Sequence, residues 1–372
     1  MKRLAVIGAS YLQLPLVLKA REMGLETVCF AWEDGAVCRD YADAFYPISV
    51  VDKEAILQVC RELKIDGITS IASDVAVPTV NYVASMMGLT GNDDAYSEVV
   101  TDKYLMRDCF SKNGVPSPGY AQTCGEIPDA VKQFSYPLIV KPTDRSGSRG
   151  VEKVDTEAGL EEAIARACSE SFHKQAIIEE FVDGREISVE SISFKGRHHI
   201  LQITDKVTTG APFFVELEHH QPSTLPQDIK SRVKDIVLNA LDALHIEYGA
   251  SHSELKITDD GHIRVIEIGA RMGGDFIGSD LVQLSTGYDF LRGVIEVALG
   301  TFTEPRLTEC SCSGVYFLCK ETERLLPVIR NASAYPEIVR AEITDSVLRS
   351  IECSADRSGY FIYKSKERYD IR

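Results

Sequence analysis

The sequence predicts a protein of mixed class, with an α/β part at its N-terminus, an α+β part in its middle and a small β-rich part at its C-terminus. Three observations predict it. Residues 1–95 alternate apolar strands with amphipathic helices, the pattern of a parallel sheet covered by helices. Residues 250–275 form a β-hairpin pattern, and residues 301–372 contain mainly strand-like segments. A chain of 372 residues is too long for one compact core, so two or three domains are expected.

The composition limits the class of partner. Fifty-six acidic and 40 basic residues give a net charge of −16, which argues against an extended nucleic-acid site. No apolar segment approaches the roughly 20 residues that span a membrane. The ten cysteines form no C-x-x-C pair, and several lie singly in apolar segments, as Cys29, Cys60 and Cys319 do. We therefore expect buried reduced thiols, a cytoplasmic location and small-molecule partners.

The N-terminal third begins with a buried strand at residues 4–7, a helix at 11–23 and a second strand at 26–30. The turn after the first strand contains Gly8 but lacks the later glycines of a dinucleotide fingerprint, so NAD is not expected. Asp74 follows a later strand, at a carboxyl end where ligands bind in open α/β sheets. A plain turn is the alternative interpretation of both features.

The middle of the chain contains a glycine-rich loop between two strands. A strand at residues 136–142 ends near Lys141, and the loop 143–150 leads to a second strand at 151–154. A Walker loop instead joins a strand to a helix and carries GK[ST], so this loop is expected to be a hairpin flap. Its amides could close over a triphosphate while Lys141 supplies a fixed charge. A mobile surface hairpin is the alternative.

A strand at residues 176–180 leads directly into Phe181 and Val182. Backbone groups at such a hinge can bind the edge of an adenine between apolar walls, and Glu186 suits the ribose hydroxyls. The following segment 205–226 is polar and contains prolines. We expect it to be irregular and to line a site.

The hairpin pattern places two carboxylates face to face. With a two-residue turn at Asp260 and Gly261, paired residue numbers sum to 521, so Glu254 lies opposite Glu267. Like charges about 5 Å apart are unfavourable, and all-oxygen ligands favour Mg²⁺ or Mn²⁺ between them. The alternative is that both carboxylates are solvated or paired with the nearby basic side chains, which are Lys256, Arg264 and Arg271.

A glycine-rich exit, residues 269–274, follows the second of these glutamates and contains Arg271. Glycines allow a backbone to approach a ligand closely, and arginine suits phosphate or carboxylate recognition. Together with a helix at 102–111 that carries Lys103, these motifs occur in an order that resembles the ATP-grasp superfamily over roughly residues 98–300. The resemblance implies an N-terminal α/β domain at 1–97, an ATP-grasp domain at 98–300 with a lid at about 115–180, and a β-rich domain at 301–372.

The resemblance also implies roles for individual residues. Lys103 and Lys141 would hold the ATP phosphates, with Ser146, Gly147, Ser148 and Gly150 in the loop that covers them. The residues Glu179, Glu180, Phe181 and Val182 would surround adenine, and Glu186 would bind the ribose. Glu254 and Glu267 would hold the metal ions, and Arg271 would bind the acyl phosphate.

One position departs from the family pattern. Many members have Asn two residues after the second metal glutamate, where this chain has Gly269, so the second metal lacks one ligand. The same loss occurs in members that resemble bacterial L-amino-acid ligases, which also carry E-x-x-H-x-x-P-S. Here that pattern is matched from Glu216 and His219 to Ser223. Lys206 in the same loop could contact phosphate, with a solvated lysine as the alternative. The pattern implies an ammonium-binding Glu216 and a general base in His219, in a substrate site that also includes Lys206, Gly273 and Gly274. A chance match in a loop is the alternative.

These features predict an ATP-dependent carboxylate-amine ligase that uses ATP and Mg²⁺ or Mn²⁺ and forms an amide, such as a dipeptide, through an acyl phosphate. The resemblance favours a homodimer. Two alternatives stay open: an enzyme that activates bicarbonate, as biotin carboxylase and carbamoyl phosphate synthetase do, and a nucleotide-binding regulator without catalysis. The sequence does not identify the acid or the amine.

Overall fold

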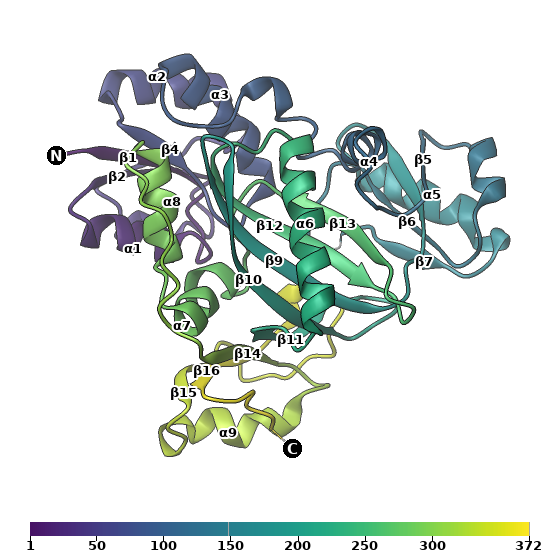
Figure 1. The fold of residues 1–372 in the computed structure, drawn as a ribbon. Helices are drawn as coiled ribbons and strands as arrows, with labels where there is room; N and C mark the ends of the chain where they lie inside the picture. The colour runs from purple at the N-terminus through teal and green to yellow at the C-terminus, as the bar shows by residue number, and fades with distance from the viewer. Residues whose placement is uncertain (148, 372) are drawn as a thin grey trace.

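The computed structural model describes residues 1–147 and 149–371, and it contains three β-sheets (Figure 1). A small parallel sheet lies at the N-terminus, a four-stranded antiparallel sheet forms the lid, and a long eight-stranded antiparallel sheet connects the rest. The expected mixed α/β and α+β class is therefore confirmed. No helix in the described residues is long and apolar enough to cross a membrane.

The N-terminal sheet has the predicted parallel arrangement, with strand order β3-β2-β1-β4. Its strands are β1 (Arg3–Ile7), β2 (Glu26–Phe30), β3 (Ala44–Tyr46) and β4 (Gly67–Thr69), and its helices are α1 (Leu14–Glu22), α2 (Lys53–Leu63) and α3 (Val77–Met87). Since the strands are parallel, their carboxyl ends lie at one edge. This edge presents the loop after β1 and the short turn of 3₁₀ helix at Asp74–Ala76.

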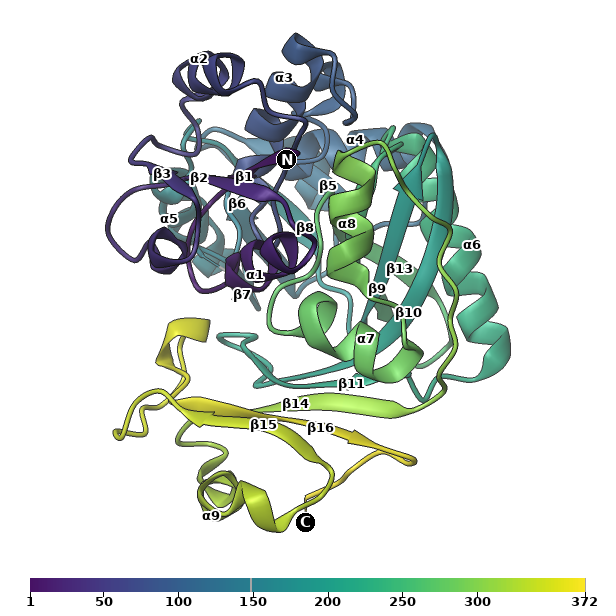
Figure 2. The same cartoon turned by 90° about the vertical axis from the view of Figure 1, so that its left-hand side faces the viewer.

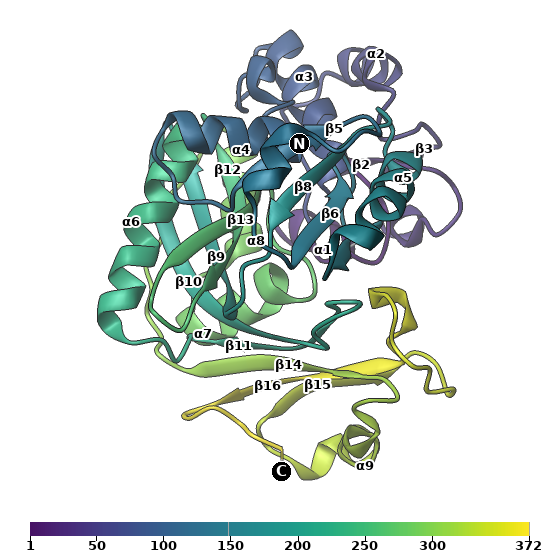
Figure 3. The same cartoon turned by 90° about the vertical axis from the view of Figure 1, so that its right-hand side faces the viewer.

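The lid is an independent small layer with its own core (Figure 3). Its elements are β5 (Tyr120–Thr123), β6 (Leu138–Pro142), β7 (Glu152–Val154), α5 (Leu160–Glu170) and β8 (Ala176–Glu180). Apolar side chains of α5, including Leu160 and Ile164, pack against β6 and β8. β6 and β7 are antiparallel neighbours, so the predicted hairpin is confirmed. The helix α4 (Lys103–Lys112) joins the lid to the long sheet.

The long sheet has the order β13-β12-β9-β10-β11-β14-β16-β15. Its strands are β9 (Arg185–Phe194), β10 (Arg197–Thr208), β11 (Glu216–Gln221), β12 (Gly249–Ile257), β13 (Ile263–Gly269), β14 (Cys312–Leu318), β15 (Ile338–Ile343) and β16 (Gly359–Ser365). The helix α6 (Gln227–Ala243) covers one face, and α8 (Phe290–Ala298) lies between the sheet and the N-terminal part (Figures 1 and 2). The short helices are α7 (Val282–Thr286) and α9 (Leu326–Arg330).

Helix α8 buries seven of its nine residues because it packs against both sheets. Phe290 and Ile295 belong to one core cluster that also contains Leu4 of the N-terminal sheet and Ile192 of the long sheet. This shared core holds the carboxyl edge of the parallel sheet against the long sheet.

One expectation about the second half of the chain was wrong in detail. The segment 205–226 is not irregular throughout, because β10 extends to Thr208 and Glu216–Gln221 form β11. The polar sequence gave no sign of this strand, since His219, His220 and Gln221 are buried polar residues. The C-terminal segment contains strands, as predicted, and they belong to the long sheet. β11 pairs with β10 on one side and β14 on the other, so β14, β16 and β15 continue the long sheet (Figure 2).

Candidate active site

The hairpin of β12 and β13 pairs Glu254 directly with Glu267, as predicted. The predicted two-residue turn is wrong, however, because Ile257 pairs with Ile263 and five residues, 258–262, make the connection. A register shift next to Glu254 compensates, with one extra residue, Ile266, on β13. Val265 is therefore buried in the core, whereas Ile266 is only partly buried.

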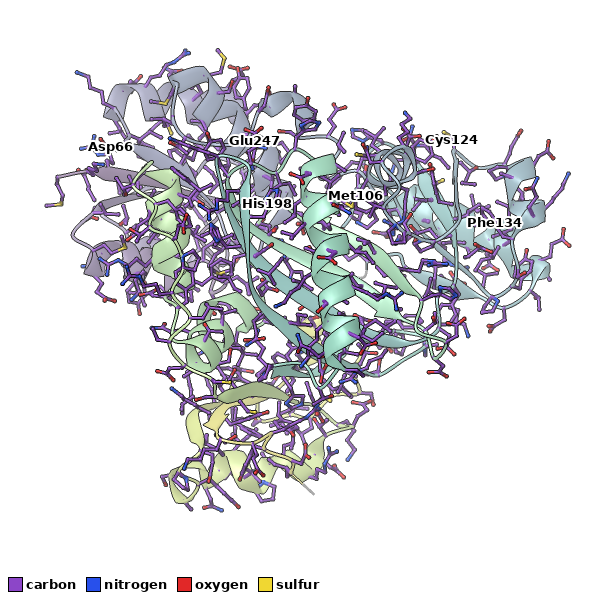
Figure 4. The ribbon with its side chains drawn as sticks, viewed as in Figure 1. Asp66, Met106, Cys124, Phe134, His198 and Glu247 are labelled. Carbon is purple, nitrogen blue, oxygen red and sulfur yellow. The ribbon has the colours of Figure 1, made fainter. Side chains whose placement is uncertain are left out.

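The extra residue is held by Arg107 of α4, which sequence reasoning missed. The Arg107 guanidinium donates to the carbonyl of Ile266, and Arg107 Nε lies 2.8 Å from Glu179 Oε1. Arg107 is 0% exposed, so its charge needs these partners. Its neighbour Met106 lies where α4 meets the long sheet, near β13 (Figure 4). The only sequence signal was a cation four residues after Lys103 on one face of the helix.

Three buried cations and two carboxylates form the phosphate end of the site. Lys103 Nζ lies 2.9 Å from Glu267 Oε1, and Lys141 Nζ lies 2.7 Å from Glu179 Oε2. Burial lowers the pKa of Lys141, whereas Glu267 raises the pKa of Lys103 against the effect of burial. With Arg107, the group has one positive charge in excess, which suits a phosphate chain. The Glu179 side chain lies between Arg107 and Lys141.

A third lysine lies among three carboxylates. Lys206 Nζ is 2.6 Å from Glu254 Oε1, 3.0 Å from Glu186 Oε1 and 3.4 Å from Glu216 Oε1. Burial lowers the pKa of Lys206, but these carboxylates raise it well above its usual value. Burial acts to raise the pKa of Glu254, but Lys206 outweighs this effect and holds the pKa well below its usual range. Glu186, Glu216 and Glu254 are thus brought together around one ammonium group.

His252 and Glu190 form a second layer beneath Glu254, and neither was predicted. His252 Nδ1 bonds to Glu190 Oε1, and His252 Nε2 lies 3.4 Å from Glu254 Oε1. Burial acts to lower the pKa of His252, but Glu190 outweighs it and raises the pKa to about 9. The Gly273 N–H donates to Glu190 Oε2 at 3.2 Å, and a side chain at Gly273 would lie 2.7 Å from His252 Nδ1. Position 273 therefore requires glycine.

Arg271 is bound by Asp74 from the carboxyl edge of the parallel sheet. Nε and Nη2 of Arg271 each donate to Asp74 at 2.8 Å, a bidentate pair. The sequence indicated both residues as candidates for a ligand site, but it did not predict their contact. Gly274 lies close to this edge too, since a side chain there would be 3.5 Å from Ala72 Cβ. The N-terminal sheet thus fixes the orientation of the arginine beside the two facing glutamates.

Aromatic side chains flank the hinge after β8. The rings of Phe181 and Phe214 have centroids 6.3 Å apart, and Lys256 Nζ lies 5.3 Å and 5.8 Å from them. Phe214 was missed by sequence reasoning. It lies in the left-handed region, with φ of 52°, in the turn between β10 and β11. Val182 is partly buried beside these rings, and the Glu180 N–H already donates to the Gly119 carbonyl at 3.0 Å.

The flap residues lie at the surface of the loop between β6 and β7. Ser146, Gly147 and Gly150 are exposed, and both glycines have φ near +70°, a conformation that glycine adopts without strain. Ser148 lies outside the described residues. Lys103 Nζ also donates to the carbonyl of Arg145 at 2.5 Å, which links the base of the flap to the phosphate end of the site.

The carboxylates suit a divalent cation. Within residues 1–147 and 149–371, no group of three or more His, Cys, Asp or Glu is arranged as a metal site. Glu254 and Glu267, which face each other, would offer two carboxylate ligands, with oxygen donors only. Mg²⁺ is commonly held in this way, by one or two carboxylates together with substrate phosphates and water.

Comparisons with known proteins agree with this geometry. The model of the ATP-grasp domain matches residues 134–280. Alanine–anticapsin ligase of Bacillus subtilis (strain 168) is 28% identical over 263 residues, in a match that covers 62% of this chain and 55% of that protein. The chain spans about half the length of the first such relatives.

Solved structures match over nearly the whole chain. The L-amino acid ligase from Bacillus licheniformis is 24% identical with a TM-score of 0.80, covering 99% of this chain and 94% of that one. The N5-carboxyaminoimidazole synthetase from Staphylococcus aureus, solved with ADP, is 16% identical with a TM-score of 0.80, covering 98% and 94%. At these identities the likeness concerns the fold. Residues 134–280 therefore match an ATP-grasp domain, and the chain as a whole shares the fold of these solved structures.

Proposed function

We propose that this protein is an ATP-dependent ligase that joins a carboxylate to an amine through an acyl phosphate. One observation carries the proposal: Glu254 and Glu267 face each other across β12 and β13, and each is contacted by a buried lysine. Carboxylates that are paired with cations in this way can exchange them for a metal ion and its bound phosphates.

The relatives support the choice of substrates. Their names include an alanine–anticapsin ligase and an L-amino acid ligase, and both names describe the joining of amino-acid-like molecules. We therefore propose amino-acid-like substrates for this chain, with residues 98–300 as the ATP-grasp domain between domains at 1–97 and 301–372.

The residues divide the work between two steps. In the first, an oxygen of the substrate carboxylate attacks the γ-phosphorus of ATP, the bond to the bridging oxygen breaks, and ADP leaves. Lys103 and Lys141 offset the phosphate charge, while Phe181 borders the base. Glu254 and Glu267 would hold Mg²⁺ or Mn²⁺, which when bound would offset the charge that develops on the phosphates.

In the second step the amine attacks the carbonyl carbon of the acyl phosphate, inorganic phosphate leaves, and the amine loses a proton. Arg271, oriented by Asp74, would bind the acyl phosphate. Both ring nitrogens of His219 are buried without a hydrogen-bond partner among the described residues, which leaves one available to accept that proton. No covalent enzyme intermediate is required, because positioning and charge stabilisation suffice.

Phosphate release from Mg²⁺-ATP with pools of carboxylates and amines tests the proposal. Activity that requires both a carboxylate and an amine is expected. Release with bicarbonate alone would instead indicate a bicarbonate-activating enzyme, and no release with any pool would indicate a nucleotide-binding regulator. Glu267→Gln should abolish turnover, and Asp280→Asn, which removes a carboxylate paired with Arg340 elsewhere, should not. Wild-type activity in Glu267→Gln would refute the metal assignment.

A further inference from the structure

Four residues from distant parts of the chain form a second ionic group, the Asp275 cluster, which consists of Glu216, His219, Asp275 and Arg357. Arg357 comes from the segment just before β16, and its Nη1 lies 2.6 Å from Asp275 Oδ2. Its Nη2 bonds to the carbonyl of Glu216 at 2.9 Å and to Glu216 Oε2 at 3.1 Å. His219 Nε2 lies 3.8 Å from the same oxygen of Asp275.

In the Asp275 cluster the two acidic side chains are more exposed than the two basic ones. The side chains of His219 and Arg357 are 1% and 8% exposed, whereas those of Glu216 and Asp275 are 22% and 26% exposed. The Arg357 guanidinium lies 3.9 Å above the ring of Phe317, and Arg357 Nε is buried without a partner in the described chain. A ligand would therefore meet the two carboxylates first.

The backbone at Asp275 is strained. Asp275 and Phe276 are consecutive non-glycine residues in the left-handed region, with φ of 50° and 66°. Such residues cost on the order of 1–3 kcal/mol each and persist where the surroundings hold them, often at functional sites. Here Phe276 is held by the rings of Phe317 and Tyr360, at 6.3 Å and 4.3 Å between centroids. The turn directs the Asp275 carboxylate to Arg357 and His219.

The two carboxylates differ in how many of their oxygens are used. Glu216 has Oε1 near Lys206 at 3.4 Å and Oε2 near Arg357 at 3.1 Å, so both oxygens face a cation. The ion pairs of Asp275 within residues 1–147 and 149–371 all use Oδ2. This leaves Asp275 Oδ1 as the oxygen of the cluster that can meet a cationic ligand.

We propose that Asp275 binds the ammonium group of the amine substrate through Oδ1, and that Arg357 positions Asp275 from below. This inference rests on the proposed ligase function and names its second substrate as a primary amine that arrives protonated. Asp275 follows Arg271 by four residues, which span at most roughly 14 Å. This spacing places the amine on the same loop as the arginine that would bind the acyl phosphate.

The sequence pattern indicated Glu216 as the residue that binds the ammonium group, whereas the contacts in the structure favour Asp275. Glu216, whose oxygens both face cations, helps hold Lys206 and Arg357 in place.

Comparing the amine substrate with hydroxylamine as acceptors separates binding of the ammonium group from formation of the acyl phosphate. Hydroxylamine is uncharged at neutral pH and traps an acyl phosphate as a hydroxamate, so its reaction does not depend on an ammonium site. Asp275→Asn should raise the KM of the amine substrate about 10- to 100-fold, as expected for a lost hydrogen bond to a charged group. Its rate of hydroxamate formation with ATP and the carboxylate should stay within about twofold of wild type. Asp280→Asn is the matched control and should change neither value.

The outcomes are distinguishable. No hydroxamate from the wild-type protein with any carboxylate would refute the proposed function itself. An unchanged amine KM in Asp275→Asn, or an equal loss of hydroxamate and amide formation, would refute the role of Asp275 alone. Because Asp275→Asn removes a partner of Arg357, the double variant Asp275→Asn/Arg357→Gln removes the buried charge as well. It should unfold at a higher temperature than the single variant while keeping the raised amine KM, and a normal KM there would also overturn the inference.

Discussion

Replacing Arg107 by Met tests whether the buried guanidinium holds the lid to the metal hairpin. The change keeps an unbranched apolar stem and removes the charge beside Glu179, which is only 2% exposed. Removing one partner of a buried ion pair costs about 3–5 kcal/mol, because the remaining charge stays buried without compensation. Lys141 still contacts Glu179 at 2.7 Å, so the lower end, about 3 kcal/mol, is expected.

The assay is urea unfolding of the nucleotide-free protein, followed by circular dichroism and by tryptophan fluorescence from Trp32, the only tryptophan. Arg166→Met is the control, because Arg166 forms a similar pair with Glu152 at 2.7 Å but is about half exposed. It should cost less than about 1 kcal/mol. A loss below about 1 kcal/mol in Arg107→Met would refute the reasoning. The double variant Arg107→Met/Glu179→Gln should cost less than the sum of the two single changes, since the residues contact each other.

Two further predictions concern the nucleotide base and pH. Phe214→Ala should raise the dissociation constant of ADP about 5- to 150-fold, which is the range for one lost base-aromatic stack of about 1–3 kcal/mol. The dissociation constant of tripolyphosphate should not change. Phe213→Ala is the control, because Phe213 is 41% exposed, and equal effects of both changes would contradict the assignment. Since the pKa of His252 is raised from 6.5 to about 9, its contribution to stability, on the order of 3 kcal/mol, is complete below pH 6.5 and is lost as the pH rises through 9. The melting temperature of the nucleotide-free protein should fall over that interval, and His252→Gln should remove this part of the slope; the same slope in the variant would assign it to other groups.

Local patterns in the sequence were sufficient for several features. The alternation of strands and helices in residues 1–95 predicted the parallel sheet, and the glycine-rich loop between two strands predicted the flap. The predicted pairing of Glu254 with Glu267 is correct, but the predicted turn does not produce it. The predicted turn was too short, and the extra residue Ile266 restored the pairing.

The long sheet shows where local patterns fail. β11 is a buried strand with the sequence ELEHHQ, which has no apolar alternation. Its polar side chains are accommodated by partners far away in the chain: His220 Nδ1 lies 2.9 Å from the Tyr363 hydroxyl, and Gln221 donates to Thr204 at 3.0 Å. A pattern of hydropathy cannot predict a strand whose burial depends on hydrogen bonds to other elements.

The sequence by itself determined the class of fold, the order of the motifs and the residue types of the site, because these depend on local periodicity and on chemistry read at single positions. Only the tertiary structure decided which charges meet. Arg107 with Glu179, Arg271 with Asp74, His252 with Glu190, and Arg357 with Asp275 are each separated by at least 62 residues in sequence. Such pairs form because a buried charge needs a partner wherever packing places it, and packing is a property of the whole chain.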